Sequence, residues 1–352
     1  MEKVNKIATI DLPLHDGKAP YWLVKLMKEL SKEICEIIIK EYGTFEFLNR
    51  ISNPFWFQSL GCVLGYDWHS SGVTTVVTGV LKEVLNKSEL GIIVAGGKGK
   101  ISKRTPEDIQ ILSKKIGIEE ERVKNFQYIS RIVAKVDNSL IQAGYKLYHH
   151  TIFIDYKLNW AVIQQGMNTE DLTARRYHWF SNDVKDFVVE PHTAIVCDVK
   201  KEKVLNMVAI ESEENRKACV DLINEGPSKI ERSIKEAIRG PLDKWFENHG
   251  FRKVPHYMMP KEINWKAIKE LYERKPKKYI EIVEFQGVGQ STIRALSLVA
   301  EIIYGSPASW RDPVKYTFAH GGKDGVPYPV DKKIYRQTIE ILRDAIQRAN
   351  IG

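Results

Sequence analysis

Strand patterns are confined to the first part of this 352-residue chain, and this uneven distribution limits the possible folds more than any other feature. Short runs of apolar and β-branched residues, typical of buried strands, all lie before residue 215. They are Ile7–Ile10, Leu90–Ala95, Thr151–Ile154, Trp160–Ile163, Phe187–Ile195 and Val204–Ile210. The sequence therefore predicts an α+β protein, with an N-terminal α/β domain containing a mixed sheet in residues 1–240 and an all-helical C-terminal domain in residues 261–352.

Helical periodicity is clearest in Tyr21–Tyr42, where apolar residues form one stripe between Lys and Glu, and Gly43 is predicted to end this helix. A hairpin turn at Tyr156–Asn159 is predicted to join two of the strands. Further helices are predicted at Thr105–Gly117, Val123–Gly144, Ser212–Glu225, Pro227–Arg239 and Ile334–Ala349.

Composition and charge indicate the kind of partner and the cellular location of the protein. The net charge of +8 and the pI near 9.0 favour a polyanionic partner, although a basic protein without such a partner fits the charge equally well. The four cysteines are far apart, which predicts reduced thiols, and no signal peptide or membrane-spanning run is present. We therefore expect a cytoplasmic protein without a membrane partner; abundant Lys, Glu and Ile hint at a thermophilic source.

The segment Tyr279–Tyr304 contains two helical patterns on either side of a Gly-Val-Gly sequence. Gly287 and Gly289 can take backbone angles closed to other residues, and the amides that follow lie at a helix start, where the dipole favours an anion. This arrangement resembles the helix–hairpin–helix module, which grips the DNA backbone without sequence specificity. The residues expected to contact DNA are Gly287, Val288, Gly289, Ser291, Thr292 and Arg294. The alternative is an ordinary helical hairpin whose glycines allow close packing.

Side chains suited to phosphate chemistry gather in and around the predicted hairpin strands. Adjacent guanidinium groups suit phosphate, whereas His and Asp suit metal binding or proton transfer. The residues in question are Lys135, Asp137, His149, His150, Asp155, Arg175 and Arg176. Earlier in the chain, Asp11 follows a predicted strand, and Asp67 and His69 precede a predicted helix start. A plain loop and a helix N-cap explain these last positions equally well.

The first functional hypothesis is a metal-dependent nuclease that acts in DNA repair. Carboxylates would hold one or two Mg²⁺ or Mn²⁺ ions, which orient a water and offset charge on the scissile phosphate. The expected metal ligands are Asp11, Asp67, Asp137 and Asp155, with Asp155 at the centre of the site. Proton transfer would fall to His69, His149, His150 or Lys135, and Arg175 and Arg176 would steady the phosphate. A DNA-binding accessory protein without chemistry is the plainest alternative.

Taken together, several strings are similar to an uncharacterised family found mostly in archaea and thermophilic bacteria, a domain of unknown function of the DUF763 type. They are ATIDLPLHDGKAPYWL, FWFQSLGCVLGYDWHSSGVTT, VAGGKGK, YHHTIFIDYKLNWAVIQQGM, ARRYHWF and GVGQSTIRALSLVAEIIYG with DPVKYTFAHGGKDGVPYPVD. The similarity covers nearly the whole chain and implies no particular activity.

A second resemblance, limited to the C-terminal part, is to the helix–hairpin–helix DNA glycosylases. It would make Asp331 the key carboxylate of a base-excision enzyme. The lysine that bifunctional glycosylases carry in the second helix is replaced here by Ser291 and Thr292, so Lys315 or Lys323 would have to fold back in its place.

Overall fold

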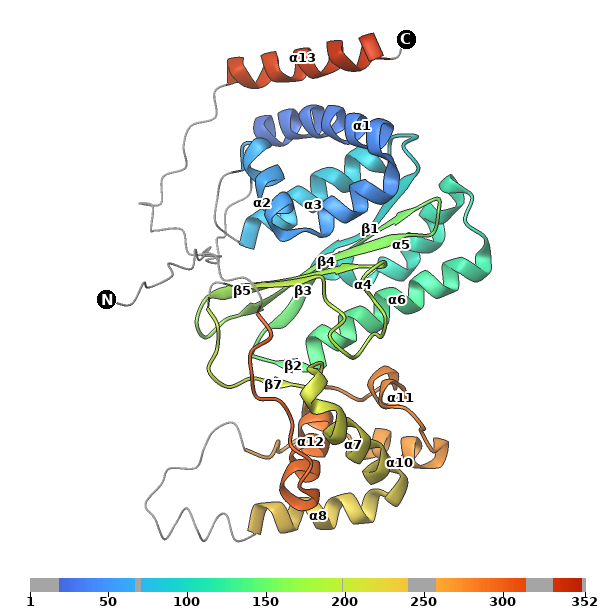
Figure 1. Ribbon diagram of the computed structural model, residues 1–352, viewed down its shortest axis with the longest axis vertical. Helices are drawn as coiled ribbons and strands as arrows, with labels where there is room; N and C mark the ends of the chain where they lie inside the picture. Colours follow the sequence, from blue (N-terminus) through green and yellow to red (C-terminus); the bar gives the residue numbers. More distant parts are fainter. Residues whose placement is uncertain (1–18, 67–70, 198, 240–257, 315–331, 350–352) are drawn as a thin grey trace, which may run out of the picture.

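The computed structural model describes residues 19–66, 71–197, 199–239, 258–314 and 332–349. A five-stranded sheet lies at the centre, with helices on both of its faces and a further group of helices beyond one end (Figure 1). The predicted strand Ile7–Ile10 and the predicted site residues Asp11, Asp67, His69, Lys323 and Asp331 lie outside the described residues.

The central sheet is antiparallel throughout. Its order is β1 (Ile92–Lys98), β3 (Lys146–Asp155), β4 (Trp160–Asn168), β5 (Thr173–Phe180) and β6 (Ala194–Cys197). A second, two-stranded sheet pairs β2 (Ile141–Gln142) with β7 (Leu205–Asn206). The α+β class is therefore confirmed, but the predicted mixed pairing is wrong, because every described pair of strands is antiparallel. Short turns join β3, β4 and β5, and a short turn can only reverse the chain direction.

Two segments predicted as strands are mostly irregular. Within Phe187–Ile195 only the last two residues enter β6, and Val204–Ile210 contributes only β7. The carboxylate of Asp186 accepts hydrogen bonds from the backbone amides two and three residues later (2.6 and 3.0 Å), which folds the chain into a turn. Pro191 has no amide proton to offer a neighbouring strand. Local apolar character was therefore not sufficient for pairing.

Alternate residues of each strand point to opposite faces of the sheet, and this gives two hydrophobic cores. Phe153 and Ile163 belong to the core beneath α1 (Tyr21–Ser52), α2 (Pro54–Val63) and α3 (Ser71–Leu85). Ile152 and Val162 belong to the core on the other face, which α6 (Glu120–Ser139) covers. The short helices α4 (Lys100–Lys103), α5 (Thr105–Leu112) and a 3-10 turn (Ser113–Ile116) lead from β1 to α6.

The first helix is longer than predicted. It continues through Gly43 to Ser52, but the backbone at Gly43 is not helical (φ 84°, ψ 169°), so the predicted end appears as a kink. The next residue, Asn53, caps α2 by accepting hydrogen bonds from the amides of Phe55 and Trp56 (2.9 and 3.2 Å).

The helices beyond the end of the sheet form one packed group (Figure 1). After a 3-10 turn (Ile210–Ser212) they are α7 (Glu213–Glu225), α8 (Pro227–Arg239), α10 (Trp265–Arg274), α11 (Tyr279–Glu284) and α12 (Gln290–Tyr304). The apolar residues of α7, α10, α11 and α12 are continuous with the core beneath α6. The helical group is therefore built onto the sheet rather than separated from it by solvent.

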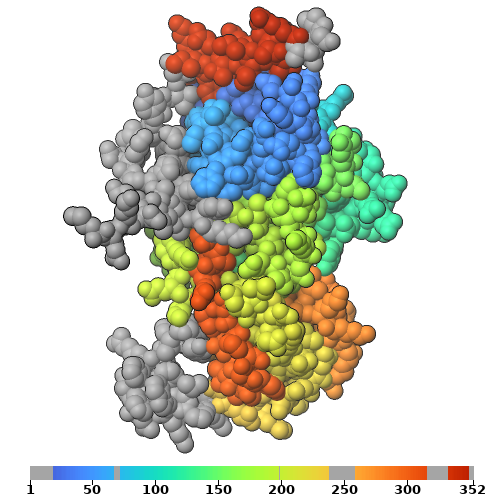
Figure 2. All heavy atoms as spheres, viewed as in Figure 1, coloured from blue at the N-terminus to red at the C-terminus, as the bar shows by residue number. Residues whose placement is uncertain are grey.

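The chain leaves α12 and returns toward the sheet as an extended segment. Figure 2 shows residues 305–314 as a narrow orange-red band on the surface between the lower helices and the sheet. The amide of Val204 donates to the carbonyl of Trp310 (3.1 Å), and the amide of Asn206 donates to the carbonyl of Ser309 (2.8 Å). These bonds attach the segment to the strand β7.

The last helix, α13 (Lys332–Ala349), lies at the opposite end of the molecule from α12 (Figure 1). We expected it in the C-terminal helical module, but it packs against α1. Tyr335 and Ile339 join the core beneath α1, and the Tyr335 hydroxyl donates to the carbonyl of Leu64 (3.0 Å). The residues 332–349 therefore belong with the N-terminal helical layer.

Candidate nucleic-acid interface

The predicted hairpin is present between α11 and α12, and each glycine has a different role. Gly287 has a left-handed backbone (φ 90°), and a Cβ atom there would lie 2.7 Å from Nδ2 of Asn264. The same Asn264 group donates to the Gly287 carbonyl (3.1 Å), so this position requires glycine. Gly289 has an extended backbone (φ −142°), which contradicts our expectation of an unusual angle. Its Cβ position faces open space, however, and a ligand can therefore approach the chain closely.

The start of α12 is fixed against the end of α6. Gln290 donates its side-chain amide to the carbonyl of Asn138, and the Gln142 side chain donates to the carbonyl of Gln290 (2.9 Å). Arg294 donates to Oε1 of Gln142 (3.2 Å) and lies over the Trp310 ring. The N-cap residue, Gly289, has no side chain and makes no capping hydrogen bond to the first turn. The hairpin is thus attached to α6, and its N-cap leaves the first-turn amides without the usual side-chain acceptor.

The six predicted DNA contacts are not equally placed. Gly287 is exposed and Gly289 and Ser291 are partly exposed, whereas Thr292 and Val288 are buried (2% and 4% exposed). Backbone amides and Ser291 are therefore the groups that the hairpin presents.

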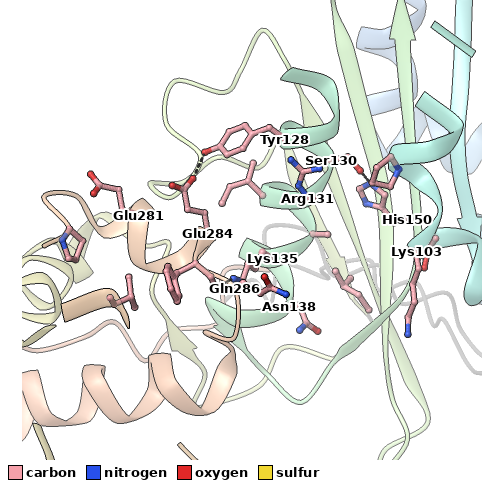
Figure 3. A pocket seen from close by; sticks show the side chains of 18 of the residues that line it. Lys103, Tyr128, Ser130, Arg131, Lys135, Asn138, His150, Glu281, Glu284 and Gln286 are labelled. Carbon is pink, nitrogen blue, oxygen red and sulfur yellow. Dashed lines mark hydrogen bonds between the residues drawn. The ribbon is translucent and has the colours of Figure 1, made fainter. Parts of the chain in front are cut away.

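A cleft of about 1200 Å³ opens beside the hairpin, between α6 on one wall and α10 and α11 on the other (Figure 3). The α6 wall carries Arg131 and Lys135, and Lys103 lies nearby at the end of α4. The other wall carries the carboxylates of Glu270, Glu281 and Glu284 together with Arg274. Glu284 accepts a hydrogen bond from the Tyr128 hydroxyl across the cleft (3.0 Å). The cleft therefore has a cationic wall and a largely acidic wall.

Lys135 lies where the cleft meets the hairpin. Its ammonium donates a hydrogen bond to the carbonyl of Phe285, the residue that follows α11. Burial lowers the pKa of Lys135 to about 8, because a desolvated ammonium is destabilised, while the charge of Glu284 opposes this shift. The ammonium of Lys135 therefore loses its proton at a lower pH than that of an exposed lysine.

Ser130 and His150 line the same cleft and are hydrogen-bonded (Figure 3). Oγ of Ser130 lies 2.8 Å from Nε2 of His150, and Nδ1 of His150 lies 2.7 Å from Oε1 of Gln164. Gln164 in turn donates to the carboxylate of Asp137. Asp137 also bonds to His192 and accepts from the Trp179 indole N–H (2.9 Å). One hydrogen-bonded chain thus runs from the cleft along the α6 face of the sheet.

Asp155, the predicted centre of a metal site, is fully buried on the opposite face. Its carboxylate accepts from the backbone and side-chain amides of Asn159 (2.8 and 3.0 Å) and from the Thr44 hydroxyl (2.8 Å). These bonds close the β3–β4 turn and anchor it to α1. Asp155 and Asp137 face opposite sides of the sheet, so the structure does not bring these two predicted ligands together. Among the described residues, no group of three His, Cys, Asp or Glu side chains could hold a metal ion.

The two adjacent arginines are also separated by the sheet. Arg175 pairs with Asp312 (2.7 Å) on the α6 face, whereas Arg176 donates to Nε2 of His178 (2.9 Å) on the α1 face. Both guanidinium groups are fully buried. A predicted phosphate clamp of the two side chains is therefore not formed, because consecutive residues of a strand point to opposite sides.

The neighbouring histidines separate in the same way. Nε2 of His149 contacts the hydroxyls of Thr78 and Thr151 (both 2.9 Å) on the α1 face, although the residue also lines the cleft beside His150. Burial lowers the pKa of His149 to about 3, with smaller contributions from His150 and Lys98. His149 is therefore neutral at physiological pH.

The series of hydrogen bonds that links Ser130, His150, Gln164 and Asp137 was not predicted, although the sequence indicates part of it. Ser130 and Asp137 are seven residues apart on a helix and share one face. The turn after Asp155 pairs Ile154 with Trp160, and the same register pairs His150 with Gln164. The sequence does not show that this helix face packs on this strand pair.

The geometry defines an α+β protein with a glycine hairpin beside a deep cleft that holds a hydrogen-bonded serine and histidine. A family model described as a protein of unknown function, DUF763, matches residues 8–330, and the chain belongs to this family. No curated protein and no solved structure matches the chain. Among the described helices, none has the length and apolarity needed to cross a membrane.

Proposed function

We propose that this protein binds DNA through its sugar–phosphate backbone, at the hairpin and along the cationic wall of the adjacent cleft, and processes it there. The observation that carries the proposal is the open space at Gly289 at the uncapped start of α12. Backbone amides at a helix start bind phosphate oxygens, and they read no base sequence. Arg131, Lys135 and Lys103 extend the same electrostatic attraction into the cleft.

Phosphodiester cleavage is the processing step that we propose. The cleft combines cations with groups that move protons, and hydrolysis of a phosphodiester needs both. A divalent cation, Mg²⁺ or Mn²⁺, remains part of the proposal, and two of its expected ligands, Asp11 and Asp67, lie outside the described residues. Cleavage of labelled single- and double-stranded DNA, measured with Mn²⁺ and with EDTA, tests this step.

Replacing Gly289 with glutamate tests the binding site. We expect the Gly289→Glu variant to bind a labelled duplex at least about tenfold more weakly, because the new carboxylate occupies the space of a phosphate and repels it. The fold should be unaffected, since the Cβ position is open and the backbone angles are ordinary. Fluorescence anisotropy over a range of salt concentrations gives both the affinity and the number of phosphates contacted.

Gly79→Glu is the matched control for this substitution. Gly79 is exposed on α3, its Cβ position is also open, and the variant has the same net charge. Binding by Gly79→Glu should equal that of the parent protein. If the two variants bind equally well, the hairpin has only a structural role.

A second prediction concerns Lys135 and pH. Because the pKa of this side chain is about 8, its charge is largely present at pH 7 and largely lost at pH 9. The DNA affinity of the parent should fall over this interval, and Lys135→Gln should bind a few-fold more weakly at pH 7 with little further loss at pH 9. Dissociation constants at pH 7, 8 and 9 and constant ionic strength measure this. A fall in affinity between pH 7 and pH 9 that is as large in Lys135→Gln as in the parent would contradict it.

A further inference from the structure

Ser130 and His150 form a pair whose surroundings fix its protonation. Both side chains are nearly buried (3% and 5% exposed), yet both line the cleft. The Gln164 amide group donates to the carboxylate of Asp137 and to the carbonyl of Val133 (3.2 Å), so its oxygen must face His150. An oxygen only accepts, and Nδ1 of His150 must therefore carry the proton.

This tautomer leaves the second ring nitrogen as a base. A neutral imidazole has one N–H, and because it is on Nδ1, the lone pair of Nε2 faces the Ser130 hydroxyl at 2.8 Å. Burial lowers the pKa of His150, which keeps the ring neutral, although the bond to Gln164 and the charge of Asp137 oppose this shift. Ser130 is therefore the donor of this hydrogen bond, in the geometry that general-base activation of a hydroxyl requires.

The adjacent histidine shows that such an arrangement is not a general property of buried histidines in this sheet. His149 also contacts hydroxyls, those of Thr78 and Thr151 (both 2.9 Å), and it lines the cleft as well. Nδ1 of His149, however, has no hydrogen-bond partner among the described residues. The bond from Nδ1 to Gln164, which fixes the tautomer, therefore distinguishes His150.

We propose that Ser130 is a nucleophile, activated by His150, that attacks a phosphodiester bound in the cleft. Lys103 and Arg131 line the same cleft and favour an anionic phosphate over a neutral ester. The identification of this phosphodiester as DNA rests on the proposed function. The assignment of Ser130 as the nucleophile does not, because it rests on the hydrogen bonds of His150. Gln164 and Asp137 are positioning residues, since they act through His150.

The reaction balances without any further reactant than water. Oγ of Ser130 forms a bond to phosphorus while the bond from phosphorus to the leaving oxygen breaks. The hydroxyl proton passes to Nε2 of His150 and then to the leaving oxygen, which departs as an alcohol. Water then attacks the phosphoserine diester by the same route in reverse, restoring the serine and releasing a phosphate monoester.

The test uses the full chain and bis(4-nitrophenyl) phosphate, a phosphodiester that needs no hairpin, in parallel reactions with Mn²⁺ and with EDTA. The parent should release 4-nitrophenolate, and mass spectrometry of rapidly quenched samples should place the phosphoryl adduct on the peptide that contains Ser130. Ser130→Ala and His150→Gln should each reduce the release at least about 100-fold. The rate in the parent should keep its plateau below pH 6.5, since the lowered pKa of His150 leaves the base neutral there.

Ser52→Ala is the matched control, since it also removes a buried hydroxyl, one that donates to the carbonyl of Leu48 (2.8 Å) far from the cleft. It should react as the parent does, and circular dichroism should show all variants folded. Release by Ser130→Ala equal to that of the parent, no release by the parent, or an adduct on another residue would overturn the proposal. Failure of the DNA-binding proposal is seen separately, in the duplex affinity of Gly289→Glu, because the small phosphodiester does not need the hairpin.

Discussion

Replacing Asp312 with alanine is expected to lower the free energy of unfolding by about 3 to 5 kcal/mol. Asp312 bonds to Nη2 of Arg175 (2.7 Å) and accepts from the amide of Lys201 (2.8 Å). The side chains of Arg175 and Asp312 are completely buried. The variant would leave a buried guanidinium without its counterion, and it would also release residues 305–314 from β5. Urea denaturation followed by circular dichroism measures the loss.

Two further variants separate the charge from the packing. Asp344→Ala removes a carboxylate from an exposed ion pair with Arg348 and should change the stability by less than about 0.5 kcal/mol. The double variant Arg175→Met with Asp312→Leu should recover much of the loss, because no buried charge then remains unpaired. A denaturation curve for Asp312→Ala that overlays that of the parent would show that this ion pair does not hold the segment.

Replacing Gly96 with alanine is expected to cost about 3 kcal/mol or more, or to prevent the accumulation of folded protein. Gly96 has a left-handed backbone (φ 96°), and a Cβ atom there would lie 2.2 Å from the carbonyl oxygen of His150. The paired strands β1 and β3 would have to separate at this point, since Gly96 lies opposite Thr151 in the register. Because His150 would move with its carbonyl, the reaction at Ser130 should be lost as well.

Gly79→Ala provides the comparison for this substitution. Gly79 lies within the helix α3 with open space at its Cβ position, so alanine should stabilise the protein by about 0.5 to 1 kcal/mol. Thermal unfolding of both variants in parallel measures the difference. If Gly96→Ala melts within a degree or two of the parent, the approach of β1 to His150 is less constrained than the structure indicates.

Local patterns predicted the elements whose residues follow one period. The apolar stripe of α1, the hairpin at residues 285–289 and the turn between β3 and β4 are all present, and each depends on neighbours in sequence. Strand β5 was missed because Arg175, Arg176 and His178 interrupt its apolar alternation, and each finds a buried partner that no local pattern reveals. The predicted position of α13 was wrong for a related reason. An apolar stripe shows that one face of a helix is buried, but it does not show which other element covers that face.

The sequence indicated several residues of the candidate site but not how they are arranged. His150, Lys135 and Asp137 were selected for their chemistry, and the structure places all three on or beside α6. The separation of Arg175 from Arg176 follows from strand alternation once β5 is known. The cleft itself depends on how α11 packs against α6, a long-range contact between segments about 150 residues apart, and the sequence of either helix alone does not contain it.

The contact between α13 and α1 has a consequence for how the chain matures during synthesis. The helix α1 emerges from the ribosome before the residues that cover it, Tyr335 and Ile339, which follow it in the chain after the whole sheet and the helices α7 to α12. Domains usually fold as they emerge, beginning at the N-terminus. Here the first helical layer keeps an uncovered apolar face until α13 has been made, so its packing is completed only after the sheet and the helices α7 to α12 have been synthesised.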